Sequence, residues 1–118
     1  MLQAVLPYTR GKRCLFVGGD PREEKRREIE IALELDDLAW PAVPRKASPS
    51  ELEPEIAKSD LTALLIRFMG HGFNQSVSLT KRHGVRLIRL PRGLGLRRIV
   101  HDFYTQLAAQ RVEEIVSA

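Results

Sequence analysis

The chain has 118 residues, of which 43% are hydrophobic and 29% charged, a composition typical of one soluble globular domain and not of a disordered segment. No apolar run approaches the roughly 18 residues of a membrane span, and the N-terminus lacks the charge order of a secretion signal. These features exclude a membrane partner and favour a cytoplasmic location. The formal net charge is +4, and the stretch from Leu61 to His101 contains no Asp or Glu. The C-terminal half therefore suits an anionic partner.

The first predicted element is a buried strand in RCLFVGG, residues 13–19, which ends at two glycines. This strand contains the single cysteine, Cys14, which has no partner for an internal disulfide and lies in an apolar run. We expect a buried, unreactive thiol in a reducing compartment. Residues 1–10 show no clear pattern and are expected to form an N-terminal tail, so that residues 11–118 make up one domain.

The stretch DPREEKRREIEIALEL, residues 20–35, predicts a helix directly after the glycines. Asp20 can cap this helix, Pro21 suits its first position, and Glu23 stands at the capping-box spacing. The order strand, glycine turn, helix is typical of the start of an α/β domain.

The rest of the chain continues this alternation. The strand predictions rest on short apolar runs, and the helix predictions on a capping serine, a terminal glycine or helical spacing. In chain order, the expected elements are a strand at 36–44, a helix at 48–60, a strand at 61–68, a helix at 71–84, a strand at 85–90 and a long helix at 94–118.

Strands that alternate with helices predict a parallel sheet covered by helices on both faces. Right-handed crossovers leave few topologies, and the flavodoxin-like strand order 2-1-3-4 suits four strands best. We therefore expect a single three-layer, Rossmann-like α/β domain with a four-stranded parallel sheet and a long C-terminal helix.

Ligands of such sheets bind beyond the carboxyl ends of the strands, where the strand order reverses. Here this crevice falls between the turn after the first strand and the loop after the third. Glycines let the backbone approach a ligand, and the helix starts that follow offer N–H groups to an anion. The predicted ligand-binding residues are Gly18, Gly19, Asp20, Arg67, Gly70, His71, Gly72, Asn74 and Arg92. For Asp20, a helix cap is the alternative role.

Of the three histidines, His71 alone falls at the predicted crevice, where a cap of the next helix is the alternative role. His83 precedes a glycine at a helix end, and His101 lies within the last helix, so both are expected to be structural or surface residues. No spacing of His, Cys and carboxylates indicates a zinc site. Haem or a metal bound by His71 stays open, although no second ligand is visible, and the cofactor is unknown.

A second set of residues carries the positive charge of the acid-free region. It comprises Lys81, Arg82, Arg86, Arg89, Arg97 and Arg98. These residues are an alternative site for nucleic-acid phosphates, whereas protection of an edge strand explains Arg86 and Arg89 equally well. Arg97 and Arg98 open the last helix, where cations oppose the helix dipole, which suggests an external anion.

The last helix is amphipathic and long for a sheet of short strands. Its overhang predicts a homodimer, and packing over the N-terminal segment is the alternative.

The motifs FVGGD, Trp40 after the second strand, LTALLIRFMGHGFN and KRHGVRLIRL resemble the family catalogued as domain of unknown function 2325, over residues Lys12 to about Leu107. In that family we expect Ser or Asn before the histidine and a polar residue after it, where this chain has Gly70 and Gly72. The resemblance implies a small Rossmann-like domain with no established reaction.

Three functions follow from these patterns. The first is a non-catalytic ligand-binding or regulatory domain that recognises a nucleotide or another phosphorylated anion. The second is a nucleic-acid module that uses the basic residues between 81 and 98, although few aromatics accompany them for base stacking. An enzyme with His71 as general acid or base ranks last, because no carboxylate or nucleophile is placed beside it.

Overall fold

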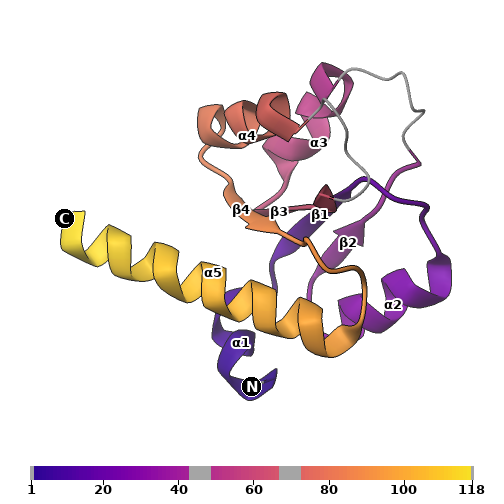
Figure 1. The fold of residues 1–118 in the computed structure, drawn as a ribbon, viewed down its shortest axis with the longest axis horizontal. Coiled ribbons are helices and arrows are strands. Elements are labelled where there is room, and N and C mark those ends of the chain that lie inside the picture. Colours follow the sequence, from indigo (N-terminus) through magenta and orange to yellow (C-terminus); the bar gives the residue numbers. More distant parts are fainter. Residues whose placement is uncertain (1, 43–48, 67–72, 118) are drawn as a thin grey trace.

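The computed structural model describes residues 2–42, 49–66 and 73–117. Its elements alternate as the sequence predicts, with an additional helix at the N-terminus (Figure 1). In chain order they are α1 (Leu2–Thr9), β1 (Arg13–Val17), α2 (Glu23–Ala32), β2 (Asp37–Ala39), the 3-10 helix η1 (Pro49–Leu52), α3 (Glu53–Lys58), β3 (Leu61–Leu64), α4 (Phe73–Arg82), β4 (Arg86–Arg89) and α5 (Leu96–Ser117).

The four strands form one parallel sheet in the order β2-β1-β3-β4, which confirms the predicted topology. Cys14 of β1 pairs with Leu38 of β2 on one side and with Leu61 of β3 on the other. Ala63 of β3 pairs with Ile88 of β4. The carboxyl ends of β1 and β3 are therefore neighbours, and the fold is that of a single Rossmann-like domain.

Helices cover both faces of the sheet, which makes three layers (Figure 1). One face packs on α1, α2 and α5, through a core that contains Phe16, Ile29 and Phe103. The other face packs on α3 and α4, through a smaller core that contains Val17 and Ile56. Successive residues of β1 point to opposite cores, as the two-residue period of a strand requires.

The N-terminal residues differ from the expected tail. Residues 2–9 form helix α1, whose Val5 is fully buried in the main core. The Thr9 hydroxyl, also buried, donates a hydrogen bond of 2.8 Å to the Leu33 carbonyl, and the Tyr8 ring packs edge-on against Tyr104 of α5. Tertiary contacts thus hold a segment that is too short to be stable as an isolated helix.

Helix α2 begins later than expected. Its N-cap is Arg22, in an extended conformation and without a side-chain cap, so Asp20 does not cap this helix. Proline disfavours the helical conformation for the residue before it, and Pro21 therefore keeps Asp20 outside the first turn. Glu23 and Glu24 occupy that turn, where acidic groups interact favourably with the helix dipole.

Cys14 is buried as expected, with 2% of its surface exposed, and it forms no disulfide. Burial, with a smaller contribution from Asp37, raises the pKa of its thiol far above the usual range. The thiol is therefore protonated and inert at neutral pH.

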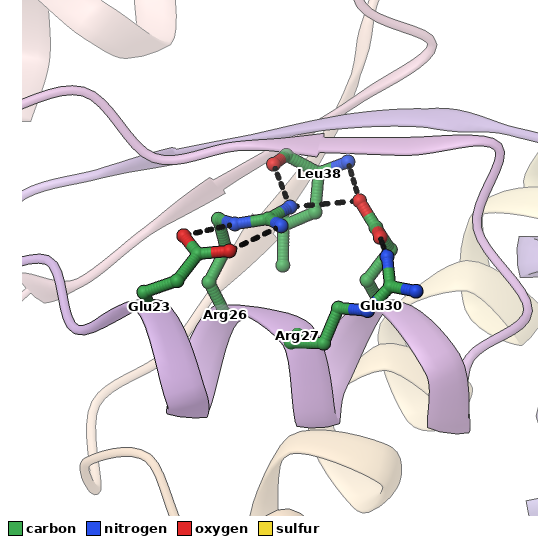
Figure 2. Close-up of polar contacts among 5 residues, drawn as sticks. All are labelled: Glu23, Arg26, Arg27, Glu30 and Leu38. Carbon is green, nitrogen blue, oxygen red and sulfur yellow. Dashed lines mark hydrogen bonds and ion pairs between the residues drawn. The ribbon is translucent and has the colours of Figure 1, made fainter.

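Both edges of the sheet are closed by side chains from the helices beside them. At the β2 edge, the Leu38 N–H donates to the Glu30 carboxylate at 2.9 Å, and the Arg26 guanidinium donates to the Leu38 carbonyl at 2.9 Å (Figure 2). At the β4 edge, the Gln106 amide exchanges two hydrogen bonds of 2.7 Å with the backbone of Arg89. These side chains occupy the positions of a further strand, and so block edge-to-edge pairing.

We expect Gln106→Leu to lower the free energy of unfolding by about 1–2 kcal/mol and to increase self-association, because it removes two hydrogen bonds and opens the β4 edge. Urea unfolding and light scattering measure the two effects. Thr105→Val is the matched control, since it adds apolar surface at the preceding position of α5 and keeps the bonds to Arg89. Equal scattering by the two variants would contradict the role of Gln106 in closing the edge.

Candidate functional site

The predicted crevice lies at the carboxyl edge of the sheet, the edge at which the strands end. After β1, Gly18 and Gly19 have φ angles of 103° and 70°, in a region that L side chains rarely adopt. The Trp40 indole N–H donates a hydrogen bond of 2.9 Å to the Gly18 carbonyl, and Trp40 itself is 6% exposed. The turn is therefore held by a hydrogen bond from the neighbouring β2 segment, and its backbone favours glycine at both positions.

Two other predicted residues lie near this edge. Asp20 is exposed next to the glycine turn, and Asn74 is exposed in the first turn of α4. The Asn74 side chain has no hydrogen-bond partner within 2–42, 49–66 and 73–117; its carbonyl accepts a bond from Ser78. Four predicted residues lie outside the described residues, namely Arg67, Gly70, His71 and Gly72.

The turn between β4 and α5 brings three arginines to the same edge. Arg92 lies in the turn, and Arg97 and Arg98 belong to the first turn of α5, which contains no acidic residue. The Arg98 guanidinium donates a hydrogen bond of 3.0 Å to the Arg92 carbonyl, so these two residues are in contact. All three side chains are exposed, and none forms an ion pair with another residue that the structure describes.

The charges at this edge are unevenly distributed. At the start of α2, Glu23 and Glu24 place negative charge beside the glycine turn. Hydrogen bonds from Arg26 lower the pKa of Glu23, so this carboxylate is ionised at neutral pH. The first turn of α5 carries Arg97 and Arg98 and no acidic residue. An anion at the carboxyl edge is therefore favoured on the α5 side, beside the ends of β3 and β4.

Asp102 is a further candidate residue of the carboxyl-edge site, and the sequence analysis did not single it out. It is 8% exposed, and its Oδ2 atom has no hydrogen-bond partner in the described part of the chain. Gln110 bonds to Leu87 and Gln106 to Arg89, so one turn of α5 advances two residues along β4. The turn of α5 that precedes Gln106 therefore places Asp102 just beyond the end of β4. An acidic residue within an apolar helical stripe was the available signal.

The alternative nucleic-acid residues do not form one group. Lys81 and Arg82 end α4, which precedes β4, whereas Arg97 and Arg98 begin α5, which follows it. Arg82 pairs with Glu53 at 3.1 Å, and Arg86 pairs with Glu114 of α5. Arg89 is exposed at the end of β4. Of this set, Arg89, Arg97 and Arg98 therefore lie toward the carboxyl edge with Arg92, whereas Lys81, Arg82 and Arg86 lie toward the amino edge.

The two described histidines have different surroundings. The His83 Nε2 atom lies 2.9 Å from the Glu53 carboxylate, and the hydrogen bonds from His83 and then Arg82 lower the pKa of Glu53. His83 thereby joins the end of α4 to α3. The His101 ring lies on the surface of α5, 3.5 Å from the Asp102 carboxylate.

Within residues 2–42, 49–66 and 73–117, no three His, Cys, Asp or Glu side chains are grouped as metal ligands would be. Over the same residues, no helix is both long and apolar enough to span a membrane. Comparisons of the chain with protein-family models, with curated proteins and with solved structures found no match.

Proposed function

We propose that this protein is a non-catalytic ligand-binding or regulatory domain that recognises a nucleotide or another phosphorylated anion at the carboxyl edge of its sheet. The observation that carries the proposal is the group of Arg92, Arg97 and Arg98, exposed at the start of α5 without an acidic partner among the described residues. Guanidinium groups bind phosphate oxygens in bidentate geometry, and a helix start adds backbone N–H donors.

The fold supports the same edge of the sheet. Parallel sheets of this type bind ligands where the strand order reverses, between the ends of β1 and β3. The glycine turn at Gly18 and Gly19 lets a ligand approach the backbone from the β1 side. We retain Arg67, His71 and Asn74 in the proposal as further donors to the anion. Membership of the family catalogued as domain of unknown function 2325 is likewise a proposal.

Removing the charge of Arg92 or Arg98 is expected to weaken anion binding about tenfold or more, because a hydrogen bond to a charged group contributes about 1.5–3 kcal/mol. A thermal-shift screen of nucleotides and pyrophosphate measures this effect. A ligand at a hundredfold excess over its Kd stabilises the folded state by about 2.7 kcal/mol, a shift of several degrees.

The variants for this screen are Arg92→Gln, Arg98→Gln and His71→Ala, and the control is Arg10→Gln, which removes an exposed arginine paired with Glu34 at 3.2 Å. The proposal predicts that the first three reduce the shift and that the control retains it. No shift with any small anion would contradict the proposal. Stabilisation by RNA or DNA alone, with a steep decline in salt, would favour the nucleic-acid alternative instead.

We also propose that the output of this domain is a change in a homodimer formed through α5. The end of this helix projects beyond the rest of the molecule (Figure 1). It exposes Val112, Ile115 and Val116 by 59%, 67% and 78%, at a spacing that places them on one helix face. A second copy of this chain would cover these side chains.

The dimer proposal predicts that Ile115→Asp shifts the protein to monomer in sedimentation equilibrium, because a carboxylate is costly to bury in an apolar interface. Ile31→Asp makes the same replacement at a residue of α2 that is 62% exposed, and it should remain dimeric. A monomeric unmodified protein at all concentrations would refute this part of the proposal.

A further inference from the structure

A concave site lies at the opposite edge of the sheet, where the strands begin. This amino-edge cavity has a volume of about 470 Å³, within the range of small-molecule sites. Five parts of the chain line it, namely α1, the turn before β1, the start of β3 with its preceding turn, the start of β4 with its preceding turn, and the C-terminal half of α5. The side chains that matter for recognition are Tyr8, Lys12, Asp60, Arg86, Arg111 and Glu114.

Two cations of this cavity have no acidic partner. Lys12 and Arg111 form no ion pair with any residue in the described ranges, whereas Arg86 pairs with Glu114. The Asp60 carboxylate accepts a hydrogen bond of 2.9 Å from the Arg13 N–H and is thereby partly satisfied by the backbone. The charge that remains for a ligand is positive, and it comes from the α1–β1 turn and from α5.

An aromatic wall stands beside these cations. The Tyr8 ring is held edge-on by Tyr104, with ring centroids 6.3 Å apart. The Arg111 guanidinium carbon lies over the Tyr8 ring, 6.0 Å from its centroid, so the cation and the aromatic ring belong to the same wall of the cavity. Pro7, which is exposed, and Val85, which is half-buried, add an apolar part to the lining.

We propose that the amino-edge cavity binds a small molecule in which a phosphate or carboxylate is joined to a planar ring. Lys12 and Arg111 bind the anionic group, and the ring packs on Tyr8 and the apolar lining. Asp60 and Glu114 disfavour a ligand that offers negative charge alone, so the ring is part of what is recognised. This site is independent of the carboxyl edge, because the two lie at opposite ends of the strands.

Isothermal titration calorimetry with phenyl phosphate, benzoate and inorganic phosphate tests the proposal on the full chain. We expect phenyl phosphate or benzoate to bind more tightly than inorganic phosphate. Arg111→Gln and Lys12→Gln should each weaken that binding about tenfold. Tyr8→Leu should reduce the preference for phenyl phosphate or benzoate over inorganic phosphate. Which of the two aryl anions binds more tightly distinguishes a phosphate ligand from a carboxylate ligand.

Two controls separate this site from its surroundings and from the proposed function. Lys81→Gln removes a neighbouring cation that does not line the cavity, and Arg97→Gln removes one from the carboxyl edge. Both variants should bind the aryl anions with the affinity of the unmodified protein. In NMR spectra of each, adding an aryl anion should shift the backbone amides of Gly11 and Gly84. Absent binding, or affinity unchanged in Arg111→Gln and Lys12→Gln, would overturn the proposal. Equal affinity for inorganic phosphate would do the same.

Discussion

Replacing Phe103 with alanine is expected to lower the free energy of unfolding by about 3–5 kcal/mol. Phe103 is fully buried and joins α5 to the sheet. Its ring lies 6.4 Å from that of Phe16, which in turn contacts Trp40 at 5.7 Å between ring centroids. The substitution therefore leaves a cavity at the centre of the larger core and removes contacts among three aromatic residues.

Urea unfolding followed by the fluorescence of Trp40, the single tryptophan, measures this loss. Ile31→Ala is the control, because Ile31 is 62% exposed, lies outside the proposed dimer face and should change stability by less than about 0.5 kcal/mol. If Phe103→Ala unfolds the chain entirely, the milder Phe103→Leu keeps most of the volume and should still be clearly destabilised. A loss below about 1 kcal/mol for Phe103→Ala would show that α5 does not pack as described.

The second large effect concerns Glu30, which joins α2 to the edge strand β2. Its side chain is 13% exposed and contacts Arg26 at 2.8 Å, Arg27 at 3.1 Å and the Leu38 N–H at 2.9 Å (Figure 2). Burial alone would raise the pKa of Glu30, but the hydrogen bonds from Leu38 and Arg26 outweigh it and lower the pKa. Glu30→Gln is expected to reduce stability at neutral pH by about 1–3 kcal/mol, because Arg26 loses a charged partner.

The pH dependence follows from the direction of this pKa shift. A carboxyl whose folded-state pKa is lowered contributes stability above its unfolded pKa, about 4.3 for glutamate, and loses it as the pH falls through the folded-state value. As the pH falls from about 5 through the folded-state pKa of Glu30, the unmodified protein should therefore lose more stability than Glu30→Gln. Urea titrations at a series of pH values measure the difference.

Glu28→Gln provides the comparison for this experiment, since Glu28 is 49% exposed and pairs with Lys25 only at 3.5 Å. It should follow the unmodified protein at every pH, because exposed ion pairs contribute little. Identical acid profiles for Glu30→Gln and the unmodified protein would show that the Glu30 carboxylate does not stabilise the β2 edge.

The strand order could be predicted because each strand is a short apolar run and each connection contains a helix, which leaves few parallel arrangements. Helix α1 could not be predicted, because its eight residues include Pro7 and its stability comes from the burial of Val5 and the contact of Tyr8 with Tyr104. The start of α2 was misplaced because Asp20 has the spacing of a cap, whereas the proline after it sets the backbone.

The roles of the basic residues were harder to predict from the sequence, because their acidic partners lie far along the chain. Arg82 and Arg86 are paired with Glu53 and Glu114, which lie 29 and 28 positions away in the sequence. Local spacing gives no sign of such pairs. The amino-edge cavity is equally hidden, since five separate parts of the chain must meet to form it. Arg92 could be placed correctly, because it follows a strand whose end was predicted.

The most direct test of anion binding at the carboxyl edge is a titration of the isotope-labelled protein with pyrophosphate, followed through the backbone amides by NMR. The proposed function predicts that the largest shifts fall on Gly18, Gly19, Gly93 and the first turn of α5, and that Arg98→Gln strongly reduces them at the same subsaturating concentration of pyrophosphate. Shifts confined to Gly11 and Gly84 at the amino edge, or no shifts at all, would contradict it.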